Sequence, residues 1–268
     1  MQNLISYLVV VFIYLAVAVD FWRVAKLPDK NLKLHSTMIA LALVLHGWLL
    51  YTHLFSSAGL NLGFYLALSA ILWLTVLIYW LVSLKHPLYS LQAFVLPLAA
   101  VFAFLPVLSQ QSYYVEIEGA QLLLIHVGVA FIAYSLFTFA TLHAMLMMIA
   151  ERSLHQKKTF IQLPSFPPLL VMEKLLFRVI SIGFVLLTLT LISGVFFSEQ
   201  LFGKAAKFNH KTIFSVASWL IYGWLLFGHY QYGWRGKKAT NLTLIGFVLL
   251  LLAYVGSKFI LQVLMGKD

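Results

Sequence analysis

Eight long apolar runs constrain this chain more than any other feature of its sequence. Each run offers the roughly 20 residues that an α-helix needs to cross the hydrocarbon core of a bilayer, and each is about twice as long as a membrane-spanning β-strand. Backbone groups in lipid must bond within their own segment or around a closed barrel, so runs of this length predict transmembrane helices. The predicted spans are 3–21, 37–55, 63–84, 89–108, 120–149, 175–198, 211–230 and 241–263.

The composition agrees with a chain that lies in a membrane. Of its 268 residues, 62% are hydrophobic and 10% are charged, which is more apolar surface than a soluble domain of this length buries. We therefore predict an all-α polytopic membrane protein in which residues 1–268 form a single transmembrane bundle of eight helices. Residues 2–19 lack the basic start and the small-residue cleavage site of a signal peptide, so the first run is expected to remain as a span.

The distribution of Lys and Arg predicts the orientation. With eight spans, 13 of the 18 basic residues fall in loops on one side of the membrane and 5 on the other. The positive-inside rule makes the first side cytoplasmic, so both termini are predicted to be extracytoplasmic. The net charge of +10 is then mainly a topology signal that also attracts anionic lipid. Because the basic residues are scattered over short loops, we predict a lipid bilayer as partner and no nucleic acid.

Several classes of site are excluded by what the sequence lacks. It has no cysteine, which removes disulfides, thiolate metal sites and covalent haem attachment through Cys-x-x-Cys-His. It also has no P-loop, Gly-rich nucleotide turn or Ser/His/Asp spacing. Metal chemistry in this chain would therefore use His, Met, Tyr or carboxylate ligands.

Histidine is the ionisable side chain that lies at membrane depth, whereas the carboxylates fall at span ends or in loops. Buried ionisable groups in membranes are costly and mark candidate sites. Neutral imidazole is the commonest protein metal ligand and an axial ligand of haem iron. The candidates within or next to spans are His46, His126, His143, His210 and His229. The loop histidines His35, His86 and His155 are interpreted as solvated surface residues, and His53, near the outer end of the second span, as an ordinary interfacial residue.

Spacing decides which candidates can act together. His210 and His229 are 19 residues apart, or roughly 28 Å along a helix, so they cannot bind one iron. His126 and His210 both lie on the predicted outer side, and His229 lies in the inner half. His143 lies off the helical face of His126 and is interpreted as a packing residue, while His46 can join either site or neither. For each ring, the alternative is a hydrogen bond to a neighbouring carbonyl or hydroxyl.

Four segments resemble the membrane cytochrome c assembly family, the CcsA-like haem-handling proteins. They are IHVGVAFIAYSLF (125–137), FRVISIGFVLLTLTLISG (177–194), SWLIYGWLLFGHYQYGWRG (218–236) and AYVGSKFI (253–260). They follow the family's order and predicted orientation over residues 121–264. The stretches GHYQYGWRGKKA and AYVGSKF are most similar to its YpjD-type inner-membrane branch.

The resemblance implies specific ligands. In that family, two outer histidines flank a Trp-rich loop and hold haem, and a membrane-embedded histidine serves an inner site. His126 matches the first outer ligand and His229 the membrane histidine. The chain departs from the family pattern in two places: KFNHKTIF replaces the Trp-x-Trp-Asp motif, and the second outer histidine would fall near Met265.

The outer loop that lacks the Trp motif offers a substitute. His210 lies in it, on the side of His126, and is a possible second outer ligand. Three lysines surround His210 and are candidates to pair with the haem propionates; the alternative is that they meet lipid phosphates. They are Lys204, Lys207 and Lys211.

These observations together predict a multi-pass protein of the inner (cytoplasmic) membrane that binds or handles haem during c-type cytochrome assembly. The haem would be b-type and non-covalent, and other cytochrome c biogenesis proteins would be partners. Because the Trp-rich motif is absent, we predict no full synthase activity and a role in holding and orienting haem rather than in catalysis. The alternatives are a cofactor-free membrane scaffold or accessory subunit and, third, a small-solute or proton transporter.

Overall fold

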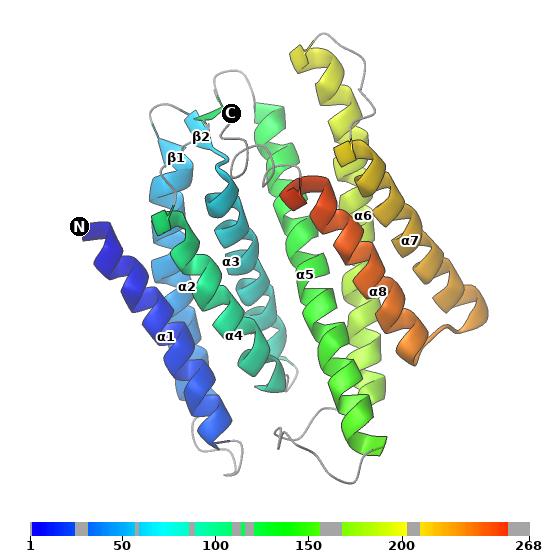
Figure 1. Ribbon diagram of the computed structural model, residues 1–268, viewed down its shortest axis with the longest axis horizontal. Coiled ribbons are helices and arrows are strands. Elements are labelled where there is room, and N and C mark those ends of the chain that lie inside the picture. The colour runs from blue at the N-terminus through cyan, green and yellow to red at the C-terminus, as the bar shows by residue number, and fades with distance from the viewer. Residues whose placement is uncertain are drawn as a thin grey trace. The chain divides into compact units, whose positions relative to one another are not determined.

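The computed structural model describes residues 2–24, 32–56, 59–85, 89–108, 114–115, 121–155, 168–202 and 210–256. Within these ranges the chain forms eight α-helices (Figure 1). The helices are α1 (Gln2–Val24), α2 (Leu32–Leu54), α3 (Phe64–Ser83), α4 (Tyr89–Phe104), α5 (Gln121–His155), α6 (Leu169–Phe202), α7 (His210–Tyr232) and α8 (Gly236–Leu251). Each of the eight predicted spans coincides with one of them.

Seven of these helices are long and apolar enough to cross a membrane. The exception is α4, which has 16 residues and contains Pro97. A 3₁₀ turn, η1 (Leu105–Leu108), continues it, and the two segments together rise by roughly 32 Å, which is enough to span. The prediction of an all-α polytopic membrane protein is therefore confirmed, and the orientation of the termini stays a prediction.

Several helices extend beyond their predicted bounds, and for α6 and α8 the reasons can be identified. Helix α6 begins at Leu169 rather than near 175, because the amphipathic segment VMEKLLF continues the helix beyond the apolar run. Helix α8 changes at its end into a π-helical turn, η2 (Leu252–Gly256). The rest of the predicted last span, 257–263, lies outside the described residues.

The chain divides into two compact units. The first comprises Met1–Glu116 and Ile149–Leu169, and the second comprises Ile117–Met148 and Leu170–Asp268. The first unit contains α1 to α4, in which α1 packs against α2 and α4, and α3 packs against the same two helices. A single bundle of residues 1–268 stays a prediction.

A small antiparallel sheet lies at one end of the first unit, where the sequence predicted only loops. Its strands are β1 (Phe55–Ser56), β2 (Gly59–Asn61) and β3 (Tyr114–Val115), in the order β1-β2-β3. Leu60 of β2 is opposite Phe55 on one side and Val115 on the other. The Asn61 side chain accepts a hydrogen bond from the Gly63 amide at 3.0 Å, which turns the chain into α3.

The second unit brings α5 to α8 together through aromatic rings that pack on glycines. The ring of Phe137 stacks on Tyr222 with centroids 4.0 Å apart. A Cβ atom at Gly183 would lie 3.1 Å from Phe137, and one at Gly246 would lie 2.9 Å from Tyr222. Small residues therefore let these helices approach closely. The Tyr222 hydroxyl donates to the Thr243 carbonyl at 3.2 Å, so its polar end is satisfied.

Candidate functional site

His126 lies in the second turn of α5 and is held from α6. Its Nδ1 atom is 2.7 Å from the Ser193 hydroxyl oxygen. Ser193 donates its own hydrogen to the Leu189 carbonyl at 2.7 Å, and a hydroxyl has one hydrogen to give. The oxygen of Ser193 therefore accepts from the N–H at Nδ1, which places the lone pair of the neutral ring on Nε2.

The surroundings of His126 combine a close backbone contact with an open helix turn. The ring is half-buried, and a Cβ atom at Gly194 would lie 3.6 Å from its Cε1 atom. On the same turn of α5, Leu122 is 60% exposed and Ile125 is 62% exposed. The imidazole is thus fixed on its Nδ1 side by α6, in a part of α5 that the second unit leaves largely uncovered.

The other predicted outer residues are only partly described. His210 is the first residue of α7 and is exposed, as is Lys211. Lys204 and Lys207 lie outside the described residues. Among the residues that the structure describes, His210 makes no hydrogen bond to His126, so a joint site of these two histidines stays a prediction.

His229 lies near the end of α7, with its ring packed on α6. Its Nδ1 donates a hydrogen bond to the Trp234 carbonyl at 2.9 Å, because a carbonyl can only accept. The imidazole is stacked on Phe177, with ring centroids 3.4 Å apart and planes inclined by 13°. As at His126, the neutral ring carries its lone pair on Nε2.

A tight turn after α7 creates the contact between His229 and Trp234. Gly233 has a φ of +66°, which favours glycine, and it reverses the chain. The Trp234 amide then donates to the Gly228 carbonyl at 3.1 Å, and its indole packs directly over Gly228. The Lys238 ammonium lies 3.2 Å from the centre of that indole ring, a cation–π contact. The GHYQYGW stretch, residues 228–234, therefore folds into a turn that holds the His229 ring in place, and we call it the Trp234 turn.

An ion pair ties the same turn to α6. Arg235 Nε lies 3.0 Å from Glu173 Oε1, with the carboxylate side chain 13% exposed and the guanidinium side chain 61% exposed. Exposed pairs contribute little to stability. The Arg235–Glu173 pair instead adds a second link between the turn and α6, the helix that carries Phe177.

The match to known proteins covers most of the chain. The family model described as cytochrome C assembly protein matches residues 34–265. The chain belongs to the cytochrome c assembly protein family. It is thus a membrane protein related to c-type cytochrome biogenesis. The matched region begins well before 121–264, the part in which the sequence segments show the resemblance.

Individual relatives agree with the family. The inner membrane protein YpjD of Escherichia coli K12 is 34% identical over 172 residues, which are 64% of this chain and 63% of that protein's length. The match thus spans less than two thirds of that relative. An uncharacterized 28.8 kDa protein of Azospirillum brasilense is 30% identical over 207 residues, 74% of this chain and 76% of the relative. A cytochrome c biogenesis protein CcsA of Prochlorococcus marinus is 34% identical over 89 residues, 33% of this chain and 28% of the relative. No solved structure matches the chain.

Two further histidines are buried in different ways. In the second unit, the fully buried ring of His143 donates from Nε2 to the Met172 carbonyl at 2.9 Å, which supports its interpretation as a packing residue. In the first unit, His46 is also fully buried. Its Nδ1 lies 3.4 Å from the Tyr14 hydroxyl and its Nε2 lies 2.9 Å from the Ser69 hydroxyl.

Sequence reasoning missed partners that come from other helices. Ser193 is an ordinary hydroxyl in an apolar run, and only folding brings it to His126. The interpretation of His35 as a surface residue is wrong: its side chain is buried and bonds Asp20 at 2.7 Å. A usable signal existed, since an acidic residue at the end of one span and a histidine at the start of the next can meet across a short connection.

Proposed function

We propose that this chain binds b-type haem non-covalently in the inner membrane and holds it during c-type cytochrome assembly, with His126 as an axial ligand. Family membership supports the link to cytochrome assembly. The name of the Escherichia coli relative, inner membrane protein YpjD, supports the inner membrane as location. The observation that carries the proposal is the hydrogen bond from His126 to Ser193.

That hydrogen bond fits the chemistry of an axial ligand. Histidines that bind metals almost always donate their other ring N–H to a nearby acceptor, which fixes the tautomer and the ring orientation. At His126 the acceptor is a Ser193 oxygen whose hydrogen is committed to the Leu189 carbonyl. The lone pair that would bind iron is therefore on Nε2 without any change of tautomer.

His229 fits the same description as a separate inner ligand. Its Nδ1 donates to a main-chain carbonyl, and its ring is held flat against Phe177. The two rings are anchored by different parts of α6, Ser193 and Phe177, which are 16 residues apart in the chain. At a rise of about 1.5 Å per residue this is roughly 24 Å, so each histidine would serve its own haem position.

The outer loop supplies the remaining groups of the proposal. His210 and Lys211 stand together at the start of α7 and are exposed. His210 would be a second ligand of the iron that His126 binds, and Lys204, Lys207 and Lys211 would pair with the propionates through charge-assisted hydrogen bonds.

Bound haem would supply an iron centre for redox or transfer chemistry. The residues of this chain would hold and orient it: His126 through its lone pair, Ser193 by fixing the imidazole, and the lysines by neutralising the propionate charge. The chain has KFNHKTIF in place of the family's Trp-rich motif. We therefore propose haem handling without full synthase activity.

Haem titration of the purified full chain tests the proposal. The matched variants are His126→Gln and His143→Gln, which make the same change on the same helix. We expect a Soret band in the wild type and in His143→Gln, and an affinity at least about tenfold lower in His126→Gln. His229→Gln would remove a second, independent component of the haem-binding curve.

Two results would count against haem binding by His126. A wild-type protein that stays colourless with added haem, while its circular dichroism shows a folded helical chain, would favour a cofactor-free scaffold. Equal haem affinities in the wild type and in His126→Gln would show that a residue other than His126 is the haem ligand. Partner proteins of the assembly process would then be sought by cross-linking in either case.

A further inference from the structure

Hydrogen bonds join α1 to α2 at three levels in the first unit. Each joins an acidic group of α1, a carboxyl or a phenol, to a histidine of α2. The pairs are Asp20–His35 at 2.7 Å, Tyr14–His46 at 3.4 Å and Tyr7–His53 at 3.5 Å, and the His53 Nδ1 of the last pair also donates to the Leu49 carbonyl at 2.7 Å. From one pair to the next the residue number increases along α1 (7, 14, 20) and decreases along α2 (53, 46, 35). The pairs therefore lie at successive levels of two antiparallel helices. They run from the predicted inner end to the predicted outer end.

The central level has a property that the other membrane-depth histidines lack. Tyr14, His46 and Ser69 are each 0% exposed, and the two imidazole nitrogens face the two hydroxyls. Within the described residues, neither hydroxyl has another hydrogen-bond partner. Each can therefore rotate to donate or to accept, so both tautomers of His46 are satisfied. At His126 and His229, by contrast, the acceptor permits only one tautomer.

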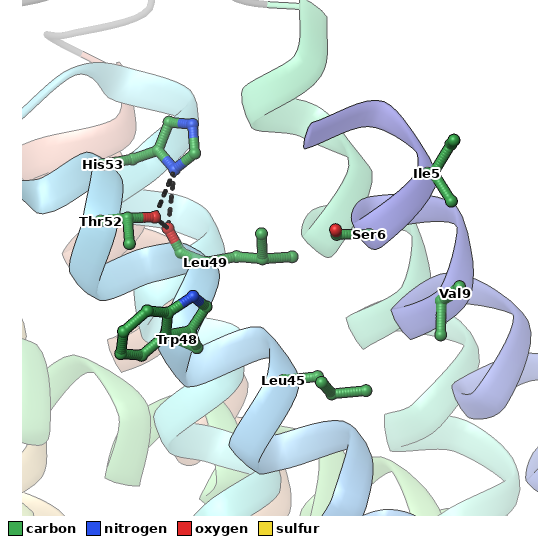
Figure 2. A pocket seen from close by; sticks show the side chains of 8 residues that line it. All are labelled: Ile5, Ser6, Val9, Leu45, Trp48, Leu49, Thr52 and His53. Carbon is green, nitrogen blue, oxygen red and sulfur yellow. Dashed lines mark hydrogen bonds between the residues drawn. The ribbon is translucent and has the colours of Figure 1, made fainter. Parts of the chain in front are cut away.

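A groove leads from the outer level toward the centre. It lies between α1 and α2 and has a volume of about 380 Å³. Figure 2 shows His53 and Thr52 at one end of the groove and Leu45 at the other, with Ser6 on α1 between them. Leu45 is the neighbour of His46 in the chain, so the groove provides room for water down to this height of α2, while the His46 ring itself is fully buried and does not line the groove.

The inner level reaches the predicted cytoplasmic surface. The Asp20 side chain is 47% exposed, whereas the His35 side chain is 6% exposed. The other ring nitrogen of His35, Nδ1, is buried and has no hydrogen-bond partner among the described residues, and the same holds for Gln92 Oε1 on α4. Such atoms are where internal water binds, and α4 packs against α1.

From these observations we propose that α1 and α2 carry a proton-transfer path with Tyr14, His46 and Ser69 as its central relay. Histidine and carboxyl chains are the usual proton relays of membrane proteins. In one step, the Tyr14 hydroxyl gives its hydrogen to Nδ1 of His46 and takes one from a hydronium ion on the outer side. Nε2 releases its hydrogen to Ser69, which passes its own hydrogen to the next water and makes it hydronium. One proton moves and the three side chains end neutral, with the His46 hydrogen on Nδ1, so the ring must return to its first tautomer before the next proton follows.

Water must bridge the levels of this path. Tyr7, Tyr14 and Asp20 are separated by seven and six residues, or roughly 9 to 10 Å along α1, which is too far for direct transfer. Water from the groove would bridge the outer gap, and water at the buried atoms of His35 and Gln92 would bridge the inner one. The path does not involve the histidines proposed for haem.

Proton flux into liposomes tests the proposal. The full chain, free of haem, is reconstituted with a pH-sensitive dye inside, and a potassium diffusion potential set by valinomycin drives protons. We expect flux above that of protein-free liposomes in the wild type. Tyr14→Phe and Ser69→Ala each remove one hydroxyl with little change of shape, and we expect flux at the protein-free level in both.

His143→Gln is the matched control, because it alters a buried histidine that has a single carbonyl acceptor, and its flux should equal that of the wild type. Circular dichroism melts verify that all variants are folded. Wild-type flux equal to that of protein-free liposomes would overturn the proposal, and so would unchanged flux in Tyr14→Phe. Because the protein is free of haem, neither result bears on haem binding by His126.

Discussion

Gly228→Ala is a sharp test of the Trp234 turn that holds His229. A Cβ atom at this position would lie 2.2, 2.3 and 2.6 Å from three atoms of the Trp234 indole. The indole would have to retreat by about 1.2 Å to reach ordinary van der Waals contact. Overpacking of this kind costs about 1–3 kcal/mol. Because the Trp234 carbonyl holds His229, the hydrogen bond, worth about 0.5–1.5 kcal/mol, is lost as well.

The helix propensity of alanine offsets part of this cost, by about 0.5–1 kcal/mol. We therefore expect Gly228→Ala to destabilise the chain by about 1–3 kcal/mol and to lower the Tm by several degrees in a detergent melt. Gly128→Ala is the control, because nothing lies within 4 Å of a Cβ atom there. It should keep or raise the Tm. A Gly228→Ala protein as stable as Gly128→Ala would refute the packing of Trp234 on this glycine.

Two further predictions concern variants that each remove one hydroxyl group. Ser193→Ala removes the acceptor that orients His126, so haem affinity should fall by about 10- to 100-fold in an absorbance titration, while the melting curve changes little. Tyr134→Phe removes the hydroxyl that donates to the Leu250 carbonyl at 3.1 Å. We expect a loss of about 1–3 kcal/mol in a denaturant or thermal melt, and an unchanged melt would show that this carbonyl is satisfied in another way.

Hydrophobic patterning was enough to predict the spans, because a membrane helix must be apolar over a length that the bilayer sets. It fails where a helix leaves the apolar zone. The start of α6 at Leu169 and the start of α8 at Gly236 both extend into polar sequence, which helical hydrogen bonding tolerates at the membrane surface.

The end of α8 shows a second limit. Its π-helical turn, Leu252–Gly256, lies just beyond Leu250, whose carbonyl accepts the Tyr134 hydroxyl. A π-turn shifts the backbone hydrogen-bond pattern by one residue, and a phenol from α5 bonds a carbonyl close to it. The hydrophobic periodicity of the α8 sequence does not predict the π-helical turn, because the phenol that bonds this carbonyl comes from another helix.

The candidate site was partly predictable. The residue type and depth of His126 and His229 indicated metal-capable rings, since buried imidazole is rare in membranes. What the sequence could not indicate was their acceptors, Ser193 and the Trp234 carbonyl, which depend on helix packing and on a glycine turn. The same holds for His46, whose two hydroxyl partners come from α1 and α3.

Chemical rescue of His126 tests the central claim most directly. In His126→Gly, the imidazole is replaced by a space that free imidazole can fill, next to the Ser193 acceptor. We predict that this variant lacks the Soret band of the outer haem and that added imidazole restores it, with no such effect in the wild type. A wild-type Soret band in His126→Gly without imidazole would contradict His126 as the haem ligand.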